Sequence, residues 1–276
     1  MRNQKLIFID LDGTLLDSNR FISDYSKQVL HRLRAQGDIV CIASGRPYGM
    51  LRLYVHELQI TTPVISNNGA NVYLPIANRT LCQTFLPIRQ TQNFLSYCRQ
   101  YNLDCAALLS DAIFTGNTPE RLARYGEYNT RLTAAGFPPL FISVLNTPEE
   151  IEPLLSQGVE RLSVLIHSEQ DYEHISSYFE TAAGLKCIRS TMESFDIIHP
   201  DVDKWYSILF IADYYGISLS DVYTFGNDRN DLTMIKKCQN SFAVRNGEAE
   251  VLKNAAHIID SNNQDGVAKA IEKYLL

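Results

Sequence analysis

The stretch that decides the fold lies near the start of the chain, where residues 6–16 read Leu-Ile-Phe-Ile-Asp-Leu-Asp-Gly-Thr-Leu-Leu. The apolar run 6–9 is typical of a strand that is buried on both faces of a parallel sheet. Asp10 and Asp12 follow it, and side chains two positions apart point to the same side of a strand. Such a pair is costly unless a cation neutralises it, and hard oxygen ligands suit Mg²⁺. The alternative is an Asp-x-Asp-Gly turn that merely ends the strand.

Polar clusters also follow the other predicted strands near both ends of the chain. The clusters are Ser44-Gly45-Arg46-Pro47 after strand 39–43, Asn67-Asn68-Gly69-Ala70 after strand 63–66, and Gly226 to Asp231 after strand 222–225. Helices are predicted over 23–36, with Ser23 as the N-cap, and over 203–215. Because ligands bind at the carboxyl ends of the strands of doubly wound α/β sheets, we expect these clusters to form one site.

The middle of the chain has a different character. Helix-like segments near 88–101, 118–135, 148–157 and 169–183 alternate with short apolar runs, and no chemical motif stands out. We therefore predict an α/β fold with a doubly wound, mainly parallel Rossmann-like sheet as its core. Residues 1–82 and 189–276 form this core, and residues 83–188 form an inserted α/β domain.

Composition limits the classes of partner. The 276 residues carry a net charge of -6 without a long basic run, which argues against nucleic-acid binding. The six cysteines are scattered without a C-x-x-C pair, as expected of reduced thiols in a cytoplasmic protein. The apolar start of the chain is too short for a signal peptide or a membrane span, so no membrane partner is expected.

The ordered motifs resemble the haloacid dehalogenase superfamily, and in particular its Cof-type phosphatase branch. Residues 9–16 are similar to its first motif, 42–47 to its second, and 226–235 to its fourth, which is commonly Gly-Asp-x-x-Asn-Asp. Residues 65–70, Lys204, 245–248 and 265–268 are also similar to features of the Cof-type branch. The similarity covers both ends of the chain in the same order, and the inserted segment corresponds to the variable cap domain of the family.

The resemblance implies a phosphatase that acts on small phosphorylated metabolites, such as sugar phosphates, with Mg²⁺ as cofactor. Asp10 attacks phosphorus and forms an aspartyl-phosphate, and Asp12 protonates the leaving alcohol and then activates water. The phosphoryl group is held by a second set of residues: Leu11, Ser44, Gly45, Lys204 and Asn230. The implied metal ligands are Asp10, Asp12, Asn227 and Asp231.

One position departs from the family pattern. Asn227 stands where the fourth motif usually supplies a metal-binding Asp, and an amide oxygen brings no charge, so the affinity for Mg²⁺ should fall. Asp231, or with less support Asp228, takes over part of that role. Asp203 beside Lys204 also departs from the usual small residues and is a plausible helix cap.

Several alternatives stay open at this stage. A phosphomutase on the same scaffold would return the phosphoryl group to a second hydroxyl, and a non-catalytic phospho-ligand-binding protein would explain Asn227. Arg46 could bind phosphate or form a structural ion pair. The chain lacks a G-x-x-x-x-G-K-[ST] and a G-x-S-x-G motif, which disfavours a P-loop kinase and a serine hydrolase. The substrate-selecting cap residues (candidates Tyr101, Phe114 and Arg124) and the oligomeric state cannot be read from the sequence.

Overall fold

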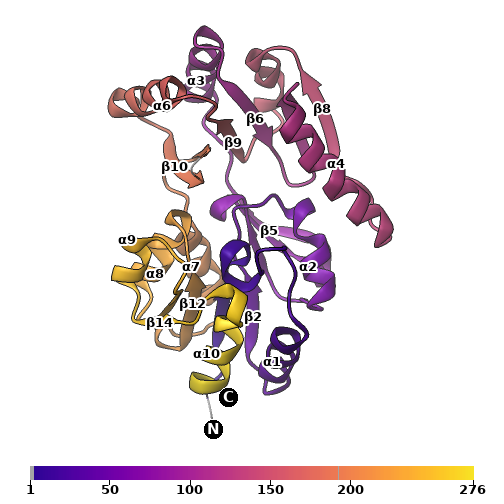
Figure 1. Cartoon of the computed structure of the whole chain (residues 1–276), viewed down its shortest axis with the longest axis vertical. Helices are drawn as coiled ribbons and strands as arrows, with labels where there is room; N and C mark the ends of the chain where they lie inside the picture. Colours follow the sequence, from indigo (N-terminus) through magenta and orange to yellow (C-terminus); the bar gives the residue numbers. More distant parts are fainter. Residues whose placement is uncertain (1–2, 192) are drawn as a thin grey trace. The chain divides into compact units, whose positions relative to one another are not determined.

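The computed structural model describes residues 3–191 and 193–276, which divide into two compact units. The first unit comprises residues up to 45 together with 54–81 and 203–276, and the second comprises 46–53 and 82–202. The first unit is therefore assembled from distant parts of the chain. Its indigo and purple segments lie beside orange and yellow ones, whereas most of the second unit is one continuous stretch of colour (Figure 1).

A parallel sheet with the strand order β14-β13-β12-β1-β2 forms the centre of the first unit. Its strands are β1 (Leu6–Ile9), β2 (Ile39–Ile42), β12 (Val222–Gly226), β13 (Asn240–Val244) and β14 (His257–Ile259). Every residue of β1 is buried, because β1 lies between β2 and β12 within a covered sheet. Ile9 pairs with Ile42 on one side and with Phe225 on the other, so these strands end at the same edge. The predicted α/β fold with a parallel sheet is confirmed.

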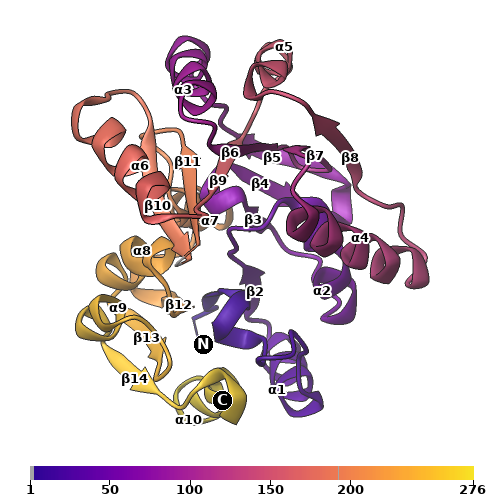
Figure 2. The same cartoon turned by 45° about the horizontal axis from the view of Figure 1, so that its top comes forward.

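Helices flank this sheet. They are α1 (Asp24–Ala35), α7 (Lys204–Tyr215), α8 (Leu232–Lys237), α9 (Ala249–Asn254) and α10 (Gly266–Tyr274). The views agree that α1 lies beside α10 and that α7, α8 and α9 group together elsewhere around the sheet (Figures 1 and 2). Ser23 caps α1 as predicted, and Asp203 caps α7 by accepting the N–H of Tyr206 at 2.8 Å. The Asp203 cap fixes Lys204 as the first residue of α7.

A small sheet with the order β3-β4-β5 continues from the end of β2. Its strands are β3 (Val64–Ser66), β4 (Asn71–Leu74) and β5 (Arg79–Gln83), and the short helix α2 (Arg52–Glu57) precedes it. Ala43 forms a parallel bridge with Ile65 of β3. Between β3 and β4 the chain turns through Asn67 and Asn68 with positive φ, a conformation that Asn adopts more readily than most residues. The turn brings the N–H of Asn68 to 3.2 Å from the carbonyl of Ser44.

A mostly antiparallel sheet with the order β10-β11-β9-β6-β7-β8 forms the second unit. Its strands are β6 (Asp104–Leu108), β7 (Ala112–Gly116), β8 (Phe141–Leu145), β9 (Arg161–Leu165), β10 (Lys186–Thr191) and β11 (Ser194–Ile198). Its helices are α3 (Ile88–Gln100), α4 (Pro119–Ala134), α5 (Glu152–Leu155) and α6 (Glu169–Thr181). Phe94 of α3 and Ile175 of α6 pack with Leu162 of β9 in one core. Tyr125 and Leu132 of α4 pack with Ile113 of β7 in another, so this unit has its own hydrophobic interior.

The boundaries of the insertion differ from the predicted ones. A boundary after residue 188 would fall inside β10, but β10 pairs with β11, and β11 pairs with β9 of the second sheet. Because these ladder hydrogen bonds hold both strands in the second unit, the chain returns to the first unit only at residue 203. Residues 46–53 also belong to the second unit, where Met50 packs against the core that contains Ile113. Among the described residues, no helix combines the length and apolar character that crossing a membrane requires.

Candidate active site

The carboxyl ends of β1, β2 and β12 bring the predicted site residues of the first unit together. The N–H of Asp10 donates to the carbonyl of Phe225 at 3.0 Å, which continues the pairing of β1 with β12 by one residue. Asp10 itself is buried. The loop 226–231 leaves β12 beside it, and Ser44 follows β2 on the other side. The parallel register therefore produces the cluster that the sequence predicts at this edge of the sheet.

Lys204 lies at the centre of this cluster. Its side chain is completely buried, and its Nζ lies 2.8 Å from Oδ1 of Asp10 and 2.6 Å from Oδ1 of Asp231. Burial on its own lowers the pKa of the ammonium, but the carboxylates of Asp10 and Asp231 outweigh it and hold the pKa of Lys204 above its ordinary value. Lys204 is therefore a charged, buried lysine that joins the first motif to the fourth.

The surroundings of the Asp10 carboxyl disfavour its ionised form and raise its pKa. Burial raises its pKa to about 7, the neighbouring Asp231 carboxylate adds to the rise, and the Lys204 ammonium opposes it. A carboxylate in this setting has few competing interactions with water. Any further positive charge at the site would favour the ionised form, which is the form that can act as a nucleophile.

Asp231 holds the loop after β12 in shape. Its Oδ2 accepts the backbone N–H groups of Asn227 at 2.8 Å and Asp228 at 3.1 Å, while its Oδ1 contacts Lys204. Both carboxylate oxygens thus have hydrogen-bond donors within the protein. Gly226 is required at the start of this loop, because a Cβ there would lie 2.6 Å from Cβ of Asp231. Asp231 therefore fixes the positions of Lys204 and of the loop 226–231.

Asn227 lies against the loop that follows β1. Its Oδ1 accepts a hydrogen bond from Oγ1 of Thr14 at 2.9 Å. Gly13 adopts a φ of +73°, and a Cβ on it would lie 2.5 Å from Nδ2 of Asn227, so only glycine allows this approach. The amide that replaces the usual carboxylate is therefore in direct contact with the first motif.

Gly45, which follows β2, meets Asn68 and also Asn230, which lies on the loop after β12. Nδ2 of Asn230 donates to Oδ1 of Asn68 at 3.0 Å. A Cβ on Gly45 would lie 2.7 Å from that same oxygen and 3.2 Å from Nδ2 of Asn230. Ser44, directly before Gly45, is buried. Sequence reasoning did not include Asn68 among the site residues, although the polar turn after the third strand was the signal that could have found it.

The remaining predicted residues differ in their burial and in their contacts. Leu11 is buried, and its carbonyl accepts the N–H of Leu16 at 2.9 Å, which closes the loop after β1. Asp12 is exposed on this loop. Asp228 caps the next turn by accepting the N–H of Arg229, and burial raises its pKa. Arg46 belongs to the second unit, where its guanidinium lies 5.9 Å from the ring centroid of Tyr128.

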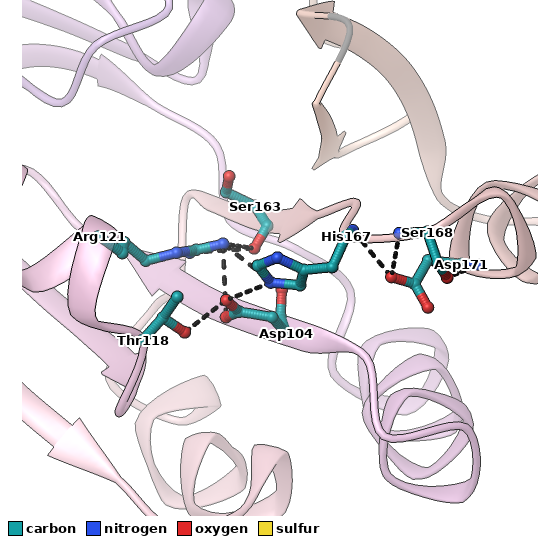
Figure 3. Close-up of polar contacts among 7 residues, drawn as sticks. All are labelled: Asp104, Thr118, Arg121, Ser163, His167, Ser168 and Asp171. Carbon is teal, nitrogen blue, oxygen red and sulfur yellow. Dashed lines mark hydrogen bonds and ion pairs between the residues drawn. The ribbon is translucent and has the colours of Figure 1, made fainter.

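A separate polar cluster lies within the second unit, at the end of the sheet where β6 begins (Figure 3). The Asp104 carboxylate accepts a hydrogen bond from Thr118 at 2.5 Å and lies 3.2 Å from Nε2 of His167. Arg121 is buried, lies 3.5 Å from Asp104 and donates to the carbonyl of Ser163. These contacts connect β6 with α4 and β9. We interpret the cluster as structural, because Oδ1 of Asp104 forms an ion pair with buried Arg121 while Oδ2 accepts the hydroxyl of Thr118.

The three candidate cap residues belong to the second unit, and Arg124 is exposed on its surface. Tyr101 packs against His174, with the ring centroids 4.0 Å apart and the ring planes tilted by 33°. Phe114 packs against the core of that unit and against Phe141. Arg124 lies on the long helix α4. None of these placements identifies a substrate-selecting residue.

The chain is similar to known hydrolases in sequence and in fold. The family model described as haloacid dehalogenase-like hydrolase matches residues 7–271, which is nearly the whole described chain. The 5-amino-6-(5-phospho-D-ribitylamino)uracil phosphatase YitU of Bacillus subtilis is 28% identical over 98% of this chain and 97% of its own length. The pyridoxal phosphate phosphatase YbhA of Escherichia coli is 23% identical over 99% of both chains.

A solved structure shows the same fold. A haloacid dehalogenase-like hydrolase from Bacteroides thetaiotaomicron superposes with a TM-score of 0.83 and covers 98% of this chain and 99% of its own. Its sequence is 24% identical to this one. Because the match includes the inserted segment as well as the parallel-sheet unit, both parts of the chain follow a known architecture.

Proposed function

This chain belongs to the haloacid dehalogenase-like hydrolase family and is a phosphatase-type hydrolase, and we propose that it hydrolyses small phosphorylated metabolites through an aspartyl-phosphate on Asp10, with Mg²⁺ as cofactor. One observation carries the proposal. The Nζ of Lys204 is buried within 3 Å of both Asp10 and Asp231 and so cancels negative charge where a carboxylate must approach a phosphate ester.

In the first step, a carboxylate oxygen of Asp10 forms a bond to phosphorus, and the ester P–O bond breaks. Asp12 gives its proton to the departing oxygen, so the alcohol leaves neutral. In the second step, Asp12 takes a proton from water, the water oxygen bonds to phosphorus, and the bond between phosphorus and Asp10 breaks. Inorganic phosphate leaves, and both carboxyl groups return to their starting states. The exposure of Asp12 on its loop is compatible with a group that meets solvent and leaving group in turn.

The phosphoryl group has a set of donors available at the strand ends. We propose that Lys204 balances its charge, and that Ser44 and the backbone N–H groups of Leu11 and Gly45 bind its oxygens. Asn230 is assigned the same task. The hydrogen bond from its Nδ2 to Asn68 supports a role for Asn68 in orienting that amide.

The residues present fit a hard divalent cation with oxygen ligands. Among the described residues no three His, Cys, Asp or Glu side chains are arranged to hold a metal. The fit therefore rests on the Asp10 carboxylate, the backbone carbonyl of Asp12, whose side chain must carry the proton for the leaving group, and the amide oxygen of Asn227. Mg²⁺ at this site would supply Lewis-acid stabilisation of the phosphoryl oxygens. We assign Asp231 to Lys204 and its loop, because both of its oxygens already accept hydrogen bonds.

The substrate class is proposed by analogy. The two relatives are named for small phosphorylated molecules, a phosphoribitylamino-uracil and pyridoxal phosphate. The net charge of -6 gives the chain no general attraction for anionic polymers, so recognition of phosphate depends on local donors.

The test is turnover of an aryl phosphate with Mg²⁺, followed by a panel of phosphorylated metabolites. We expect Asp10→Asn to abolish turnover, while Asp38→Asn, a buried carboxylate that accepts the N–H of Lys5, keeps it. Accumulation of an isomeric phosphate in place of free phosphate would favour a phosphomutase. Tight binding without hydrolysis would favour a binding protein, and turnover that survives Asp10→Asn would refute the covalent route.

A further inference from the structure

The turn after β13, residues 245–248, contacts both loops that carry the proposed metal ligands. Nδ2 of Asn246 donates to the carbonyl of Gly13 at 2.8 Å, on the loop after β1. Two residues later, the N–H of Glu248 donates to the carbonyl of Asn227 at 2.8 Å, on the loop after β12. One short turn therefore holds a backbone carbonyl of each loop.

The amide of Asn246 is held in the orientation that this contact needs. The N–H of Asn262 donates to Oδ1 of Asn246 at 3.0 Å, so Nδ2 of Asn246 points away from Asn262 and towards Gly13. Asn262 also uses its own Nδ2 to donate to the carbonyl of Leu16 at 2.8 Å. The two asparagines thus hold the loop after β1 at Gly13, in its middle, and at Leu16, at its end.

The turn also fits closely against Asn227. A Cβ on Gly247 would lie 2.9 Å from the carbonyl oxygen of Asn227, 3.0 Å from that of Val244 and 3.2 Å from Cα of Asn227. The N–H of Gly247 donates to Val244 at 2.8 Å, which makes the turn tight. Glycine at 247 therefore lets the turn lie directly on the backbone of Asn227, while Asn246 extends to Gly13.

We propose that Asn246 is a positioning residue for divalent-cation binding, which keeps the Asp10–Asp12 loop and the Asn227 loop in register. Gly13 follows Asp12 directly, so a fixed carbonyl in the Gly13–Thr14 peptide restrains the backbone one residue beyond Asp12. The hydrogen bond from Asn246 to Gly13 matters particularly in this chain. Asn227 brings no charge to a cation, so its contribution depends on accurate placement of its amide oxygen. This inference rests on the proposed function, in which these residues hold Mg²⁺.

The hydrogen bond from Asn246 to Gly13 contributes little to the stability of the fold. Asn246 is exposed, and water can replace its hydrogen bond to Gly13 when the side chain is truncated. A loss of cation affinity at nearly unchanged thermal stability is therefore the signature of positioning. A purely structural role would lower the unfolding temperature and the activity together.

The experiment compares Asn246→Ala with Asn263→Ala. Asn263 is also exposed and lies on the same C-terminal segment, but its amide contacts the N–H and hydroxyl of Ser18, beyond the loop after β1. Three quantities are measured: the Mg²⁺ concentration for half-maximal hydrolysis, the Kd of the substrate-free protein for Mn²⁺ by electron paramagnetic resonance, and Tm.

We expect Asn246→Ala to raise both cation constants by about tenfold, in the range found for residues that orient metal ligands. The KM for the aryl phosphate at saturating Mg²⁺ should stay the same, and Asn263→Ala should match the wild type. Equal cation constants in Asn246→Ala and the wild type would overturn the inference, and so would equal losses in the two variants. The Mn²⁺ measurement separates the two proposals, because it needs no turnover: a wild type that binds Mn²⁺ but hydrolyses nothing contradicts the proposed function alone.

Discussion

Replacement of Lys204 by methionine removes the buried positive charge and keeps most of the side-chain volume. The ammonium lies 2.8 Å from Asp10 and 2.6 Å from Asp231, and none of its surface is exposed. Removal of one partner from a buried ion pair costs about 3–5 kcal/mol. If the phosphoryl transition state feels that whole loss, kcat/KM falls by about 10² to 10⁴, since 1.36 kcal/mol corresponds to a tenfold change in rate.

The assay is kcat/KM for an aryl phosphate at saturating Mg²⁺, with Tm measured on the same samples. Lys5→Met is the matched control, because the Nζ of Lys5 is half-buried in the same unit and donates to the carbonyl of Leu275 at 2.9 Å. The double variant Lys204→Met/Asp231→Asn removes one of the two carboxylates that lose the ammonium, and we expect it to recover part of the loss in Tm without activity. A folded Lys204→Met protein that retains more than a tenth of wild-type kcat/KM would refute the electrostatic role.

Four further predictions concern the metal site, the titration of Asp10 and the second unit. Asn227→Asp should lower the Mg²⁺ concentration for half-maximal activity by about tenfold, because a carboxylate adds charge to the ligand set; an unchanged requirement would show that residue 227 does not limit cation binding. Because burial raises the pKa of Asp10 to about 7, activity at low Mg²⁺ should rise as the pH passes through 7, and saturating Mg²⁺ should move this limb to lower pH by competing with the proton. The raised pKa of Asp10 also makes the folded state keep a proton that the unfolded state releases between about pH 4 and about pH 7. The metal-free protein should therefore lose stability as the pH rises through this range, and unfolding curves at several pH values would check this. Asp104→Ala should destabilise the second unit by about 3–5 kcal/mol, because it leaves buried Arg121 without its carboxylate; a denaturation midpoint equal to that of the wild type would contradict the pairing.

The sequence was most informative where one physical requirement fixed the residue types. The apolar run before Asp10 requires burial on both faces, and β1 is a fully buried strand between two parallel neighbours. Ser23 and Asp203 have the side chains that cap helices, and both do so. The proximity of Lys204 to residue 10 could be predicted only from the family resemblance, since the ordered motifs alone indicated that these distant residues lie together.

The remainder depends on contacts between residues that no local pattern connects. The division into units at residue 203 follows from the pairing of β11 with β9, and strand pairing is not encoded in the strand itself. Asn246 and Asn262 look like ordinary polar residues in turns, yet they hold the loop that carries Asp12. No local pattern predicts the role of Asn68 either, because that role depends on a hydrogen bond with Asn230, far away in the sequence.

The covalent intermediate provides the most direct measurement. An acid quench during turnover, followed by borohydride, reduces an acyl phosphate to an alcohol and would convert residue 10 into homoserine, which peptide mass spectrometry detects. We expect this conversion at Asp10 in the presence of substrate and Mg²⁺, and its absence in Asp10→Asn. Rapid turnover without modification of Asp10, or modification at Asp12 instead, would contradict the assignment of the nucleophile.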